Sequence, residues 1–225
     1  MSRTQFLTYE QTAERFAGKS VAIIGSGPGC LENDGKFLDS HDIIVRVNNY
    51  KQRGYEAKVG SRTDVFYSFF GGSIKKSADE LKQDGVNLCM CKCPDAKFME
   101  SEWHRKRGME AGVDFRKIYS RRAQWWFCDT YAPTLDRFMY QFNLLGKHVP
   151  TTGFSAMLDV LSFGVSKAYI TGFDFFRSMT HNVNERWAPK NSDDPIRHMP
   201  ESELAYVRAM KDPRVTFDKR LQAML

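Results

Sequence analysis

Residues 21–30 read VAIIGSGPGC, an apolar run that passes directly into Gly25, Gly27 and Gly29. The β-branched run Val21 to Ile24 predicts a buried strand. The three glycines after it predict a tight turn whose backbone amides can approach a phosphate at the start of a helix. Such a strand-turn-helix unit is typical of a nucleotide-binding α/β protein.

A dinucleotide enzyme is one alternative for this turn, since the spacing approaches the fingerprint G-x-G-x-x-G of flavin and nicotinamide proteins. Cys30 replaces the last glycine, and the next strand ends in Arg46-Val47-Asn48 without an acid to hold a ribose diol. Both departures disfavour a dinucleotide. A turn that serves only close packing stays open as well.

Strands and helices alternate outward from this unit. Apolar, β-branched runs predict further strands at residues 43–47, 64–68, 86–91, 168–172 and 214–217, and helical patterns occupy residues 8–16, 31–38, 74–83, 134–145, 152–163, 201–210 and the C-terminus. This order predicts an α/β fold, a Rossmann-like and mostly parallel sheet with helices on both faces. Ligands of such sheets bind at the carboxyl ends of the strands.

Composition places the chain among soluble globular proteins, with 225 residues, 42% hydrophobic and 27% charged. We expect one domain over residues 1–225 that carries an inserted basic and aromatic segment at about 95–130. Apolar runs fall far short of the roughly 20 residues that span a bilayer, and the N-terminus lacks a signal sequence, so we expect a cytoplasmic protein.

The cysteines suit a reducing compartment, because five is an odd number and Cys89, Cys91 and Cys93 cannot pair regularly along one strand. Their spacing puts the three on one face of a strand. There, buried small hydrophobic residues are more common than a metal site that lacks a fourth ligand. We therefore predict no metal.

Positive charge exceeds negative charge by 33 − 27 = 6 and gathers in the inserted segment, where Arg121 and Arg122 precede Trp125 and Trp126. An anionic substrate, an acidic membrane surface or nucleic acid are the partners that such a patch suits. A non-catalytic module that binds nucleic acid is thus a second alternative. A solvated face is the commonest meaning of a charge run.

Three further motifs follow the glycine turn in order. They are Asp39-Ser40-His41-Asp42, Arg46-Val47-Asn48 and Val59-Gly60-Ser61-Arg62-Thr63. Together with the turn, this pattern resembles the large sialylmotif of the eukaryotic-type sialyltransferases. Ser26 stands where that family has asparagine. The two cysteines that join the large and small motifs in secreted relatives correspond here to Val21 and Val165, which suits the cytosol.

The C-terminal half resembles the same family. Pro150-Thr151-Thr152-Gly153, a helix and Tyr169-Ile170-Thr171-Gly172-Phe173 resemble the small sialylmotif. His181 matches the family's third motif loosely, and His198 with Glu203 matches its final H-x-x-x-x-E. The resemblance covers about residues 21–203 and implies a GT-A-like variant of the sialyltransferase fold.

The resemblance implies a donor site for a CMP-activated acidic sugar, sialic acid or a related 2-keto sugar such as Kdo. The phosphate would lie over Gly25, Ser26 and Gly27, with Asn48, Thr151, Thr152, Gly153 and Phe173 around the rest of the donor. His181 would face the leaving phosphate. His198 would be the general base for an acceptor hydroxyl, with inversion at the anomeric carbon, and Glu203 and Arg46 would support the site.

The resemblance also implies a transferase that needs neither cofactor nor metal. A CMP leaving group carries one phosphate, and the sequence contains no D-x-D motif, the carboxylate pair that usually holds a divalent ion. The acceptor would be a glycan, a lipid-linked glycan or a polysaccharide, bound with help from Arg121, Arg122, Trp125 and Trp126. A peripheral contact with an anionic membrane is compatible with this, and nucleic acid is not an expected partner.

Overall fold

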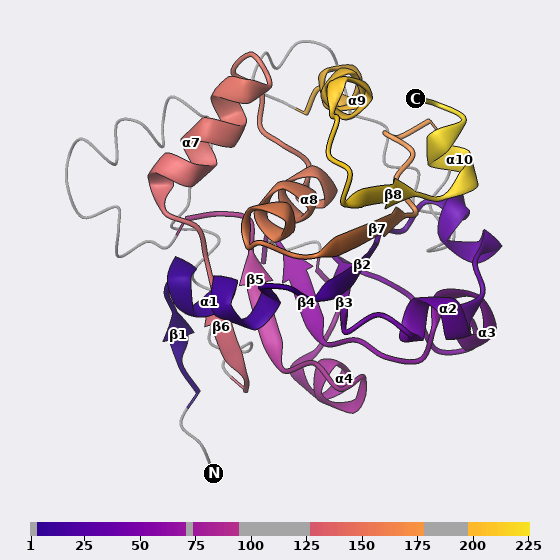
Figure 1. Cartoon of the computed structure of the whole chain (residues 1–225). Coiled ribbons are helices and arrows are strands. Elements are labelled where there is room, and N and C mark those ends of the chain that lie inside the picture. Colours follow the sequence, from indigo (N-terminus) through magenta and orange to yellow (C-terminus); the bar gives the residue numbers. More distant parts are fainter. Residues whose placement is uncertain (1–3, 71–73, 95–126, 178–197) are drawn as a thin grey trace.

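A computed structural model describes residues 4–70, 74–94, 127–177 and 198–225 (Figure 1). Eight strands form one sheet in the order β1-β6-β5-β4-β3-β2-β7-β8. Each pair of neighbouring strands is parallel. The predicted α/β, Rossmann-like sheet is therefore confirmed.

The strands are β1 (Phe6–Leu7), β2 (Ser20–Ile24), β3 (Ile43–Val47), β4 (Val65–Ser68), β5 (Leu88–Cys91), β6 (Asp129–Tyr131), β7 (Lys167–Thr171) and β8 (Val215–Phe217). The helices are α1 (Tyr9–Phe16), the 3₁₀ helix η1 (Pro28–Glu32), α2 (Gly35–Asp39), α3 (Glu56–Val59), α4 (Ala78–Gln83), α7 (Leu135–Leu144), α8 (Thr152–Ser162), α9 (Pro200–Ala209) and α10 (Lys219–Gln222).

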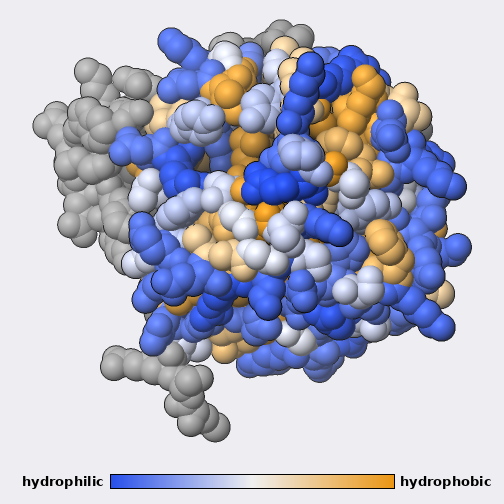
Figure 2. Space-filling view, in the orientation of Figure 1, coloured by the Kyte–Doolittle hydropathy of each residue, from blue (hydrophilic) through white to orange (hydrophobic). Residues whose placement is uncertain are grey.

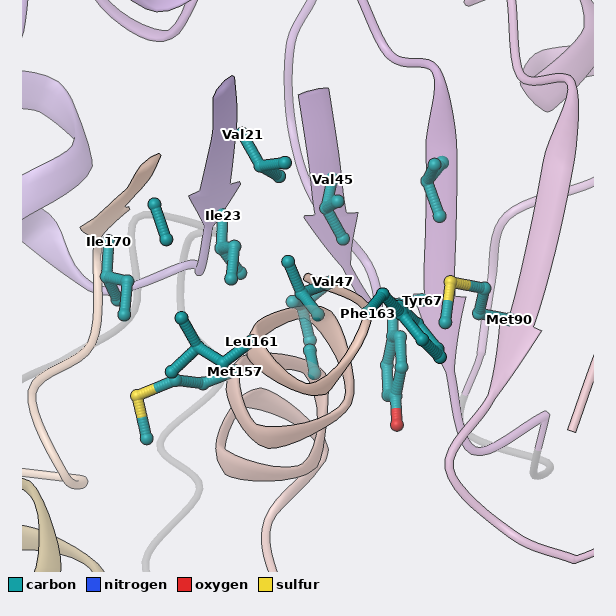
Figure 3. Close-up of a cluster of buried hydrophobic side chains, with 14 of the residues drawn as sticks. Val21, Ile23, Val45, Val47, Tyr67, Met90, Met157, Leu161, Phe163 and Ile170 are labelled. Carbon is teal, nitrogen blue, oxygen red and sulfur yellow. The ribbon is translucent and has the colours of Figure 1, made fainter. Parts of the chain in front are cut away.

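One face of the sheet is covered by α1 and α8. The strands alternate their side chains, so Val21 and Ile23 of β2 lie on this face, in one buried cluster with Met157 and Leu161 of α8 (Figure 3). Phe16 of α1 joins the same cluster. Burial of each such aliphatic side chain stabilises the fold by about 1.5–3 kcal/mol.

The opposite face is covered by α2, α3 and α4 (Figure 1). Ala22 and Ile24 pack there with Leu38 of α2 and Val59 of α3. Farther along the sheet, residues of α4 and α7 share a buried cluster with Phe66 of β4 and with Cys89, Cys91 and Cys93, which lie in β5 or just after it. Helices on both faces are thus present, and the cysteines are core residues as predicted.

One local prediction was wrong. The inserted segment was expected to run to about residue 130, but Asp129 and Thr130 belong to β6, which pairs with β1 and β5. So short a strand has no apolar alternation to reveal it. Helix α8 begins as predicted at residue 152 and is capped by Thr151, whose hydroxyl accepts from the Phe154 amide.

The strand order reverses at β2. From β2 the chain proceeds to β3, β4 and β5 on one side, and it returns to β7 and β8 on the other. In a parallel sheet, such a reversal leaves a crevice at the carboxyl ends of the strands. The loops that follow β2, β3, β5 and β7 all open at this edge.

No helix of the described segments has the length and apolar composition of a bilayer span. On the face drawn in Figure 2, hydrophilic side chains cover most of the surface and apolar residues are scattered among them.

Candidate active site

A cavity of about 350 Å³ lies at the reversal point. Seven parts of the chain line it: the turn after β2, the end of β3 with the residues that follow it, residues between β4 and α4, the residue after β5, the start of α8, the residues after β7, and α9 with the residues before it. The residues are Gly25, Ser26, Gly27, Val47, Asn48, Asn49, Phe69, Ile74, Lys92, Thr151, Thr152, Gly153, Gly172, Phe173, Asp174, Phe175, Phe176, His198 and Glu203.

The glycine turn is shaped by its contact with β7. The amide of Gly25 donates to the Thr171 carbonyl at 2.8 Å, and that of Gly27 donates to the Gly172 carbonyl at 2.8 Å. A Cβ atom at Gly25 would lie 2.4 Å from the Gly172 oxygen. These glycines are therefore needed for close packing of two strand ends, and their amides are not the phosphate cradle that the motif suggested. Ser26, half-buried between them, lines the cavity.

Asn48 offers an unused polar atom at the cavity. Its backbone has φ +54°, and its amide donates to the Tyr67 carbonyl at 3.0 Å. The side-chain oxygen Oδ1 is buried without a hydrogen-bond partner. A buried polar atom without a partner costs about 1–3 kcal/mol, so a ligand that donates a hydrogen bond here would recover that loss.

The first turn of α8 forms another wall of the cavity. Thr151 caps the helix, and Thr152 and Gly153 carry its first amide groups, where the helix dipole favours negative charge. A methyl group at Gly153 would lie 2.4 Å from Cε1 of Phe173, so the aromatic ring covers this turn closely.

Three titratable side chains hold successive residues of the segment that leads into α8. His198 Nδ1 lies 2.7 Å from the carbonyl oxygen of Val149, and Lys92 Nζ donates to the carbonyl of Pro150 at 2.7 Å. Glu203 accepts from both the amide (2.6 Å) and the hydroxyl (2.8 Å) of Thr151.

The hydrogen bond to Val149 also fixes which nitrogen of the His198 imidazole carries the proton. A carbonyl only accepts, so Nδ1 of His198 carries the proton and, in the neutral ring, Nε2 carries the lone pair.

Burial perturbs two of these groups. Glu203 is only 2% exposed, and burial raises its pKa to about 7, against the lowering effects of the Thr151 hydrogen bonds and of Lys92. Lys92 is 6% exposed, and burial lowers the pKa of its ammonium group, partly offset by Cys93 and Glu203. Shifted pKa values inside a cavity are typical of functional sites.

Arg46, expected beside the site, lies outside the cavity. It is fully buried, and its guanidinium donates to Thr63 Oγ1 (2.9 Å) and to the carbonyls of Val59 (2.6 Å), Gly60 (3.2 Å) and Arg62 (3.0 Å). We call Arg46 and residues 59–63 the Arg46 network. Burial lowers the pKa of Arg46 to about 10, so it stays charged at neutral pH.

Asp39, another residue of the large motif, holds the Arg46 network in place. Asp39 accepts from the Ser61 amide (2.8 Å), the Ser61 hydroxyl (2.8 Å) and the Arg62 amide (3.2 Å). Although burial opposes it, these bonds hold the pKa of Asp39 below its ordinary value. The motif segments Asp39 to Asp42 and Val59 to Thr63 therefore build the scaffold and not the cavity.

Several predicted site residues lie outside the described residues: His181, Arg121, Arg122, Trp125 and Trp126. Of the others, the structure brings together Gly25, Ser26, Gly27, Asn48, Thr151, Thr152, Gly153, Phe173, His198 and Glu203. No group of three or more His, Cys, Asp or Glu side chains in the described segments is arranged to hold a metal ion.

Sequence reasoning missed Lys92, Phe175 and Phe176 as cavity residues. Lys92 had a signal, because it is a charged residue directly after the apolar strand Leu88–Cys91, at the carboxyl end where ligands bind. Phe175 (φ +52°) and Phe176 (φ +60°) adopt a left-handed backbone that side chains other than glycine rarely take, and this conformation could not be read from sequence.

Comparisons with known proteins agree with the motifs. The sequence model of glycosyltransferase family 29 (sialyltransferase) matches residues 5–164. A CMP-N-acetylneuraminate-beta-1,4-galactoside alpha-2,3-sialyltransferase from Mus musculus is 24% identical over 218 residues, which cover 87% of this chain and 56% of that protein. The chain spans about half the length of the curated relatives that it matches across most of its residues.

Solved structures show the same fold. A mammalian sialyltransferase in complex with Gal-beta-1-3GalNAc-ortho-nitrophenol aligns with a TM-score of 0.56 and 17% identity, covering 92% of this chain and 72% of that one. A sialyltransferase from Campylobacter jejuni in complex with cytidine-5'-monophosphate aligns with a TM-score of 0.51 and 14% identity, covering 90% and 80%.

Proposed function

Because the chain belongs to glycosyltransferase family 29, the sialyltransferases, we propose that its cavity binds a CMP-activated acidic sugar and transfers that sugar to a glycan hydroxyl. The observation that supports this most is the convergence of the family's separate motifs on one cavity. The glycine turn, Asn48, the start of α8, Phe173, His198 and Glu203 come from distant parts of the sequence and line the same space.

The polar groups of the cavity suit a nucleotide. The unpaired Oδ1 of Asn48 would accept a hydrogen bond from the ribose or the cytosine amino group. The first turn of α8 would lie near the negative charge of the donor, which its dipole favours. Ser26 would contact the phosphate in place of the longer asparagine of the family.

His198 would act as the general base. With its proton on Nδ1, the ring presents Nε2 as the basic atom toward an acceptor hydroxyl. The hydroxyl oxygen would attack the anomeric carbon from the side opposite to CMP, the bond to the phosphate oxygen would break, and the configuration would invert. The hydroxyl proton would pass to Nε2. His181 would serve the leaving phosphate.

We propose that this reaction needs no metal ion, since the leaving group carries a single phosphate and the sequence has no D-x-D motif. The transferred sugar would be sialic acid or a 2-keto sugar such as Kdo, because both are activated as CMP esters. The acceptor would be a glycan, free or linked to lipid or polysaccharide.

Calorimetric titration with CMP, UMP, NAD and FAD tests the donor assignment. Wild type should bind CMP in preference to the other three, and His198→Ala should keep that affinity. CMP release from CMP-N-acetylneuraminate or CMP-Kdo, with a mixture of glycan acceptors, should then depend on His198. A preference for NAD or FAD, or indifference to CMP, would overturn the proposal.

A further inference from the structure

Lys92 stands out among the cavity residues, because it is a nearly buried cation for which the reaction as described has no use. It follows β5 directly, its backbone amide donates to the Ser68 carbonyl at 3.0 Å, and its side chain runs to the start of α8. Only 6% of the residue is exposed, yet it lines the cavity.

Its positive charge is poorly compensated by the protein. Nζ donates one hydrogen bond, to the Pro150 carbonyl, although an ammonium group has three protons to donate. No carboxylate in the described parts of the chain is close enough for an ion pair with Lys92. Glu203 is the carboxylic acid whose charge acts on Lys92, and both of its oxygens accept hydrogen bonds from Thr151.

The surroundings make this cation costly. The amino end of α8 carries partial positive charge, and Nζ bonds the residue that directly precedes its cap, Thr151. Desolvation adds to the cost, since buried charges in proteins are normally paired. An anion in the cavity would relieve both effects together, because it would pair with the ammonium group and with the helix dipole.

We propose that Lys92 supplies the positive charge that binds the anionic part of the donor. This inference rests on the proposed function. A CMP-activated acidic sugar carries two negative groups, the phosphodiester and the sugar carboxylate, and either one satisfies the chemistry of a buried ammonium group. Lys92 is then a donor-binding residue that pairs with one of these two negative groups.

Three substitutions at Lys92 separate charge from packing. Lys92→Gln removes the charge and can still donate to the Pro150 carbonyl, Lys92→Met removes both, and Lys92→Arg keeps the charge. Lys76→Met is a matched control, because Lys76 is also largely buried, contacts Asp84 (3.2 Å) and the Tyr50 ring, and lies outside the cavity. Thermal unfolding of each variant shows that the protein titrated is folded.

Each protein is titrated calorimetrically with cytidine, CMP and CMP-N-acetylneuraminate. Lys92→Gln and Lys92→Met should weaken the binding of an anionic ligand by about 30-fold or more, the usual effect of removing one partner of a buried charge pair. Lys92→Arg should restore most of the affinity, and Lys76→Met should bind as wild type. A loss already visible with CMP assigns Lys92 to the phosphate. A loss confined to CMP-N-acetylneuraminate assigns it to the carboxylate.

Equal affinities of wild type and Lys92→Gln for all three ligands would overturn the inference. An equal loss of affinity for cytidine and CMP would overturn it too. Cytidine carries no negative charge, so its affinity would fall only if the substitution had moved α8. If the proposed function itself were wrong, the result would be distinguishable from these outcomes, because wild type would bind neither CMP nor CMP-N-acetylneuraminate.

Discussion

Two buried polar regions involve β3, one around Arg46 within the strand and one at the cavity beyond its carboxyl end, and they differ in how their hydrogen bonds are used. In the Arg46 network, the guanidinium donates to Thr63 and to three carbonyls of residues 59–62. At the cavity, Asn48 keeps an unpaired oxygen and Lys92 uses one of three donors. Both regions contain residues of the same motif, and only the second keeps bonding capacity for a ligand.

This difference separates scaffold from site within a motif. A satisfied buried network holds the loop in place, and its loss would be felt in stability. Buried polar groups without hydrogen-bond partners lower stability, and proteins keep them where a ligand supplies the missing hydrogen bonds. Arg46 and Asn48 are two residues apart in the sequence, so a motif match alone assigns both to the site.

The largest expected effect is at the cavity. His198→Ala should lower kcat for transfer by about 10²- to 10⁴-fold, the usual contribution of a general base, while CMP affinity stays within a few fold of wild type. His41→Ala is the matched control, because this histidine contacts the Phe37 and Leu38 carbonyls outside the cavity. Steady-state kinetics and calorimetry check both. An unchanged kcat in His198→Ala would remove its proposed role.

Arg46→Met should produce the opposite pattern. The carbonyls of Val59, Gly60 and Arg62 would lose their shared donor inside the protein, so the free energy of unfolding should fall by about 3 kcal/mol or more. Urea denaturation measures that loss, and titration below the transition measures CMP affinity. A selective loss of CMP affinity in folded protein would break the distinction between the two regions.

Glu203 should make the stability of the fold depend on pH. Its pKa is raised to about 7 in the folded protein from an ordinary value near 4.5. A raised pKa stabilises the fold fully below about pH 4.5, and that stabilisation is lost as pH rises through 7. Wild type should therefore lose about 2–3 kcal/mol relative to Glu203→Gln between pH 4.5 and 8. Denaturation at both pH values checks this, and a constant difference would contradict it.

The smallest expected effect concerns Asn48. Asn48→Gly removes the carboxamide, whose oxygen has no partner, and relaxes the backbone at φ +54°. The free energy of unfolding should change by no more than about 1 kcal/mol, because the hydrogen bond from the backbone amide of residue 48 to the Tyr67 carbonyl remains. CMP affinity should fall about tenfold through loss of one hydrogen bond to the ligand. A marked fall in melting temperature would place Asn48 with the scaffold.

Much of the fold followed from short-range patterns. The runs that became β2 and β3 were predicted to within one residue of their observed limits, since four apolar residues in each strand, ahead of Gly25 or Asn48, leave little choice. The short strands β1 and β6 could not be predicted, because two or three residues show no alternation and pair only when the sheet is formed.

The cavity was predictable where a motif placed a residue at a strand end. Asn48 was recognised in this way, and Gly153 and His198 were recognised from the family motifs alone. The rule that ligands bind at carboxyl ends of strands also applied to Lys92, for which no motif exists. Arg46 was misplaced for the same reason, because side chains alternate along β3 and residue 46 points to the face opposite to residues 45 and 47.

By itself, the sequence determined which residues form strands and turns, the family of the chain, and the residue types available for chemistry. Local sterics and hydrophobic periodicity act within a few residues, so their effects can be recognised in the sequence alone. Only the tertiary structure decided which polar groups are satisfied. The partners of Lys92, Glu203 and His198 lie 49–58 residues away. Burial, which shifts the pKa values of Lys92 and Glu203, exists only once those segments meet.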